Sequence, residues 1–124
     1  MHEWDSLVQH DYARKALAAA FALPPALQVH VARYLRLFIS DKAPQHALTP
    51  DRYATLLQAL VADINKGSIE ARGRTWSAPL AAWAGAFEAV FTAVADGRRK
   101  TPLRDHSYLH GVLVNMADQA EAKG

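Results

Sequence analysis

Arginine and lysine side chains provide the most distinctive chemistry in this sequence. From Lys66 to Arg104 the chain has seven basic and three acidic residues, a net charge of +4, whereas the remaining residues have a net charge of −2. Arginine is better suited than lysine to bidentate contacts with phosphate. The segment therefore predicts an acidic partner, most simply the phosphates of a nucleic acid. The candidate nucleic-acid-binding residues are Arg72, Arg74, Arg98, Arg99, Lys100 and Arg104.

Two of these arginines flank a glycine, in the order Arg72-Gly73-Arg74, and Trp76 follows closely. The indole ring has two interpretations: it stacks on a nucleobase, or it turns inwards and anchors a short hairpin. We favour the core position because an isolated two-stranded hairpin is marginal and must lean on the rest of the fold. For Arg72 and Arg74, phosphate contact and a solvated turn both remain open.

The densest basic run is Arg98-Arg99-Lys100, with Arg104 close behind. The run follows the C-terminus of an expected helix, where cations interact favourably with the helix dipole, and this alone would explain it. A shared phosphate-binding surface requires that the run and the hairpin arginines lie on one side of the fold.

His106 and His110 are four residues apart on an expected helix, a spacing that can place two imidazoles on one metal ion. A metal site needs a third ligand, and the sequence has neither an HExxH motif nor a companion Asp/His pair. His106 also shares the helical spacing of Leu109 and Leu113, which pack inwards. We therefore predict a packed histidine and no metal site.

Other enzyme motifs are missing from the sequence. It has no glycine-rich phosphate loop, no nucleophile elbow, no cysteine and no close pair of acidic residues in apolar surroundings. We expect a protein without catalytic activity and without a cofactor. The lack of cysteines, of an apolar run of ~20 residues and of a secretion leader predicts a cytoplasmic protein that does not enter a membrane.

Helices are expected to position these residues, since alanine alone occupies 25 of the 124 positions. Proline and capping residues punctuate the chain at Pro24-Pro25, Thr49-Pro50 and Pro79, and Gly67 and Gly97 follow two expected helices. The expected helices span roughly residues 5–22, 25–40, 50–66, 79–96 and 106–122. Asp5 or Ser6 is expected to cap the first helix and Asp105 the last, with a loop at Asp41–Leu48.

The alternating segment Ile69–Trp76, with Gly73 at its tip, predicts a short β-hairpin. The expected fold class is therefore all-α: a single domain over residues 1–124, a bundle of about five helices with one hairpin. The expected core consists of Leu35, Phe38, Leu56, Leu57, Leu60, Leu80, Trp83, Phe87, Phe91, Leu109, Leu113 and Met116.

A familiar spacing occurs in Tyr34–Phe38, Arg74–Trp83, Asp96-Gly97, Pro102-Leu103 and His106–Leu109. These stretches resemble small helical proteins encoded by prophages and mobile elements, and the resemblance covers residues 30–120. Such proteins are often encoded near replication or regulatory genes, so the resemblance implies a nucleic-acid setting. It supplies no catalytic or binding residue.

The leading expectation is a phage- or mobile-element-type accessory protein that acts near nucleic acid through the six basic residues. The alternative is a protein-interaction module, either self-associating or an inhibitor of a host or phage protein, without nucleic-acid contact. A broad apolar arc on the fourth expected helix favours this alternative if other helices leave it exposed. The arc comprises Trp83, Phe87, Val90, Phe91 and Val94.

Overall fold

The computed structural model describes residues 11, 14–15, 17–19, 21–39 and 49–123. Residues 11, 14–15, 17–19 and 21 are helical, as expected for the first helix. The cap expected at Asp5 or Ser6 and the loop expected at Asp41–Leu48 lie outside the described residues.

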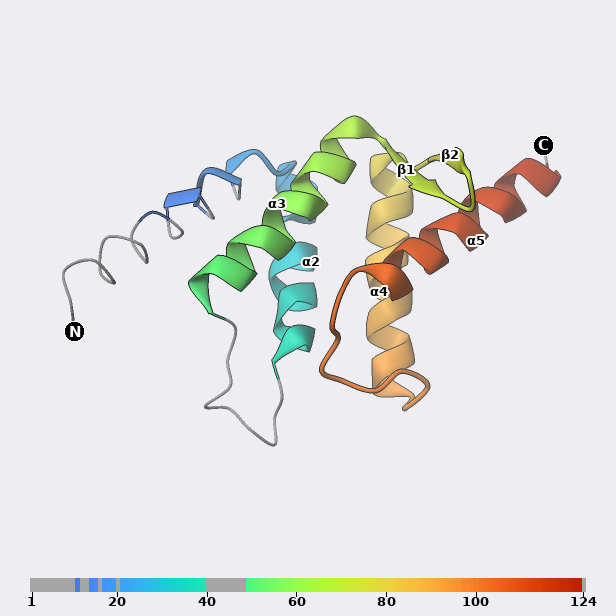
Figure 1. Ribbon diagram of the computed structural model, residues 1–124. Helices are drawn as coiled ribbons and strands as arrows, with labels where there is room; N and C mark the ends of the chain where they lie inside the picture. The colour runs from blue at the N-terminus through green and yellow to red at the C-terminus, as the bar shows by residue number, and fades with distance from the viewer. Residues whose placement is uncertain (1–10, 12–13, 16, 20, 40–48, 124) are drawn as a thin grey trace.

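The remaining elements confirm an all-α fold with one antiparallel hairpin. They are α2 (Pro25–Leu35), the 3₁₀-helix η1 (Arg36–Phe38), α3 (Pro50–Lys66), β1 (Ser68–Ala71), β2 (Arg74–Ser77), α4 (Leu80–Ala95) and α5 (Ser107–Lys123). The second helix was expected to continue to residue 40. The α-helix ends at Leu35, and the chain continues as the tighter 3₁₀-helix η1. Figure 1 shows α4 at the centre, with α2 beside it and α5 crossing it.

Local sequence signals explain where the elements begin and end. The Thr49 hydroxyl accepts a hydrogen bond from the Arg52 amide, and Pro50 occupies the first turn of α3. Gly67 ends α3 with a left-handed backbone of φ 73°. Arg72 and Gly73 both have positive φ, the two-residue turn that matches the twist of a hairpin.

The core forms where α4 meets α2 and α5, with α3 packed against α2. Tyr34, Trp83, Phe87 and Leu109 are completely buried there. The apolar arc of α4 is covered by these neighbours: of its five members only Val94 is partly exposed, so the arc offers no docking surface.

Two expected core residues are placed differently. Leu80 is 47% exposed because it begins α4, before the neighbouring helices cover that side. Met116 is only partly buried and lies against the core edge, where its Cε is 3.1 Å from the position of a Cβ at Gly85. The buried residues Leu27, Val31 and Tyr34 take part in the core in addition to the expected set.

The hairpin packs onto the helices through one side chain from each strand. Ile69 and Trp76 face each other in the strand register, and both are buried. The Trp76 indole N–H donates to the Ala71 carbonyl at 2.9 Å, so its polar edge is satisfied. This confirms that Trp76 anchors the hairpin in the core.

Among the described residues, no helix combines the length and the apolar character needed to cross a membrane.

Candidate nucleic-acid interface

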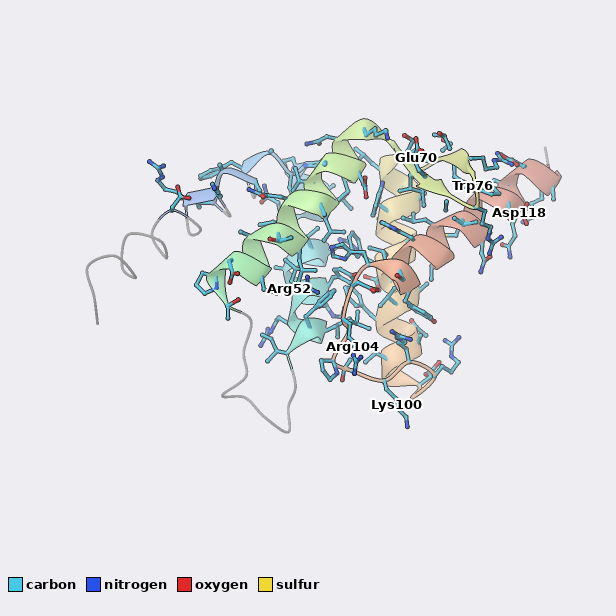
Figure 2. All side chains as sticks on the ribbon, viewed as in Figure 1. Arg52, Glu70, Trp76, Lys100, Arg104 and Asp118 are labelled. Carbon is cyan, nitrogen blue, oxygen red and sulfur yellow. The ribbon has the colours of Figure 1, made fainter. Side chains whose placement is uncertain are left out.

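The six candidate basic residues lie at opposite ends of α4. The hairpin with Arg72 and Arg74 leads into the first turn of α4, whereas residues 98–104 follow its last turn. A 16-residue helix is ~24 Å long, so the two groups are separated by about this distance. In Figure 2, Trp76 lies beside the upper end of α4 and Lys100 beside its lower end. The joint surface that the sequence analysis required does not form.

Arg74 is used within the fold. Its guanidinium stacks on the Trp76 ring, 3.8 Å from the ring centroid, and donates to both carboxylate oxygens of Glu121, at 2.6 and 3.4 Å. These contacts connect the hairpin to α5. Arg72 is exposed at the turn and has no ion-pair partner among the described residues.

The loop after α4 holds four of the candidates. Arg98 forms an ion pair with Asp96 at 3.2 Å, and the Arg99 guanidinium lies over the Tyr108 ring at 5.1 Å. Lys100 and Arg104 are exposed, with no acidic partner in the described part of the chain. The loop is held to the body by buried Leu103, whose N–H donates to the Leu37 carbonyl at 2.8 Å.

This attachment brings two further arginines to the same end of the molecule. Arg36 lies in η1, next to the residue that holds the loop, and the Arg52 guanidinium donates to the Arg104 carbonyl. Figure 2 shows Arg52 and Arg104 on this side, well away from the hairpin. We call the resulting set the basic end: Arg36, Arg52, Arg98, Arg99, Lys100 and Arg104.

Acidic residues near the basic end lower its net charge but, within the described residues, form an ion pair with only one of its cations. Asp51 accepts the Thr49 hydroxyl, and Asp105 accepts the Ser107 amide at 2.9 Å. These hydrogen bonds lower the pKa of both carboxyls, and both groups help to order the starts of α3 and α5. Of the six cations, only Arg98 has an ion-pair partner among the described residues.

Sequence reasoning named neither Arg36 nor Arg52 as a candidate. Neither lies in the basic segment, and no local pattern connects them to it. The signal is the tertiary contact of residue 37 with residue 103, which joins segments far apart in the chain.

A partly buried histidine lies behind the basic end. His106 Nε2 is 3.0 Å from the Leu56 carbonyl, and His106 Nδ1 is 2.8 Å from the Tyr34 hydroxyl. A carbonyl can only accept, so Nε2 carries the proton and Nδ1 accepts from the hydroxyl. Burial lowers the pKa of His106 and raises that of Tyr34.

His106 therefore connects α2, α3 and the start of α5, and both of its ring nitrogens are engaged. His110 Nε2 lies 3.4 Å from Asp63 Oδ2 on the neighbouring helix. Within the described ranges, no group of three or more His, Cys, Asp or Glu residues is placed to hold a metal ion.

Comparison with protein families finds that the family model HI_1489_N, described as an N-terminal domain, matches residues 1–105. The matched range includes all six residues of the basic end and stops just before His106. No curated protein and no solved structure matches the chain significantly.

Proposed function

The chain belongs to the HI_1489_N family, and we propose that it is a non-enzymatic accessory protein that binds nucleic-acid phosphates through the basic end. One observation carries this proposal: three separate segments place six cations together, and five of them lack an ion-pair partner among the described residues. Origin from a phage or mobile element, and a cytoplasmic location, stay predictions.

Phosphate contact suits this surface better than base recognition does. Its cations project from η1, the first turn of α3 and a loop, rather than from one helix face that could enter a major groove. Contacts of this kind position a protein on the nucleic-acid backbone and carry little sequence information. Binding should therefore be weakly sequence-specific and strongly dependent on salt.

Charge reversal tests the proposal. In Arg36→Glu/Arg104→Glu, two exposed cations become anions, while the Arg104 backbone carbonyl that contacts Arg52 is retained. We expect affinity for a fluorescein-labelled oligonucleotide at low salt, measured by fluorescence anisotropy, to fall by more than about tenfold on every sequence tried.

Arg72→Glu is the matched control, because Arg72 is an exposed arginine at the opposite end of α4. It should reduce affinity much less than the double variant does. Equal affinity of the wild type and the double variant would refute binding at the basic end. A loss in Arg72→Glu as large as that in the double variant would show only a general charge effect.

A second candidate function is protein interaction. The α4 arc no longer favours it, but other apolar side chains are exposed around the first helical segment and α2, notably Leu17, Phe21 and Val29. Light scattering at two salt concentrations, with and without DNA, separates the candidates. A dimer indifferent to both salt and DNA would favour protein interaction, and a monomer that joins DNA only at low salt would favour phosphate binding.

A further inference from the structure

An apolar groove lies between α2, α3 and the segment that precedes α2. The groove is open to solvent and has a volume of about 190 Å³. Its lining is mostly apolar, with one amide and one phenol side chain, and consists of Phe21, Leu23, Gln28, Val31, Ala32, Tyr53 and Leu57. We call it the aromatic groove.

Two aromatic rings at this groove are accessible to solvent. Phe21 is 78% exposed and Tyr53 is 36% exposed. Aromatic rings usually bury most of their surface in a core, and those left open in nucleic-acid-binding proteins provide stacking faces for bases. The groove is smaller than the ~300–1,000 Å³ typical of ligand pockets, which suits one flat ring system better than a whole ligand.

The aromatic groove adjoins the basic end. Tyr53 directly follows Arg52 in the first turn of α3, and Arg36 lies one helical turn beyond Ala32 on the α2–η1 segment. One helical turn rises ~5.4 Å, so a strand whose phosphates contact the basic end has a base within reach of the groove.

From this juxtaposition we infer that the protein binds single-stranded nucleic acid, with an unpaired base stacked in the aromatic groove against Phe21 and Tyr53. The inference rests on the proposed function and specifies its ligand. In a duplex the bases are stacked on one another and paired, so they cannot enter the groove unless the helix opens. A single strand offers both phosphates and free base faces.

Fluorescence anisotropy with a labelled oligothymidine of about 15 nucleotides, and with a duplex of the same length, tests the inference on the full chain. The wild type should bind the single strand at least about tenfold more tightly than the duplex. Phe21→Ala and Tyr53→Ala should each weaken single-strand binding by roughly five- to 150-fold and leave duplex binding unchanged. Tyr53→Phe retains the ring and should recover most of the single-strand affinity that Tyr53→Ala loses.

Leu80→Ala is the control for loss of an exposed apolar side chain, because Leu80 lies at the opposite end of α4. Circular dichroism should show that all four variants fold. If both alanine variants keep full single-strand affinity, the stacking site is refuted and phosphate binding stands. If Arg36→Glu/Arg104→Glu binds both oligonucleotides as the wild type does, the basic end itself is refuted.

Two further outcomes would overturn the inference. One is a wild type that binds neither oligonucleotide, which removes the proposed function as well. The other is a dimer that Phe21→Ala or Tyr53→Ala dissociates without changing oligonucleotide affinity, which would assign the groove to a second copy of the chain.

Discussion

Replacing Tyr34 by Phe removes one hydroxyl from the buried junction of α2, α3 and α5. That hydroxyl lies 2.8 Å from His106 Nδ1, and the Tyr34 side chain is completely buried. Phenylalanine fills the same space, so the ring packing persists while His106 Nδ1 loses its donor. A buried polar atom left without a partner costs about 1–3 kcal/mol of folding free energy.

This cost translates into a measurable shift of the unfolding temperature. At ~2.1 cal/mol/K per residue, the 124 residues give an unfolding entropy of about 260 cal/mol/K, so 1 kcal/mol corresponds to about 4 °C. Tyr34→Phe should therefore lower the midpoint by about 4–12 °C, as measured by circular dichroism at neutral pH.

Tyr108→Phe is the matched control. Tyr108 is only partly buried, and its ring lies beneath the Arg99 guanidinium, a contact that phenylalanine keeps. Its midpoint should stay within about 2 °C of the wild type, as expected for a change outside the buried network. If Tyr34→Phe and Tyr108→Phe unfold at the same temperature, the buried hydrogen bond does not stabilise the junction and this reasoning is wrong.

Three further predictions concern pH, glycine and salt. Burial lowers the pKa of His106, so the neutral ring stabilises the fold fully above the ordinary value of 6.5, and this stability is lost as the pH falls below that value. The midpoint of thermal unfolding should therefore fall between about pH 7.5 and about pH 5, and it should fall less steeply in His106→Gln. Gly67→Ala should lower the free energy of unfolding, measured by urea titration, by about 1–2 kcal/mol because the φ of Gly67 is 73°. Gly111 lies inside α5 with open space around it, so Gly111→Ala should raise the free energy of unfolding by up to about 1 kcal/mol. Equal shifts in the two variants would contradict this prediction. If each of the six cations of the basic end neutralises one phosphate, affinity should fall roughly 300- to 2,000-fold between about 50 and about 200 mM salt, and a flat salt dependence would exclude phosphate contacts.

Local features of the fold could be predicted from the sequence. The start of α3 at Thr49-Pro50, its end at Gly67 and the hairpin turn at Gly73 all occur where expected. The prediction that the Trp76 side chain packs into the core was also correct. Caps and turns depend on hydrogen bonds and backbone angles within about four residues, so the sequence contains nearly all the information that they need.

The arrangement of the candidate site was decided by the tertiary structure. The net charge of the segment 66–104 predicted one basic surface. The hairpin arginines of this segment and its basic loop, however, lie at opposite ends of α4 and are separated by the length of that helix. The Leu103–Leu37 hydrogen bond then brings Arg36 to the loop, and the Arg52–Arg104 contact adds a third segment. The residues of each pair are more than 50 positions apart in the sequence, and they meet because the helices pack around one core. A local sequence pattern holds no information about contacts between residues so far apart in the chain.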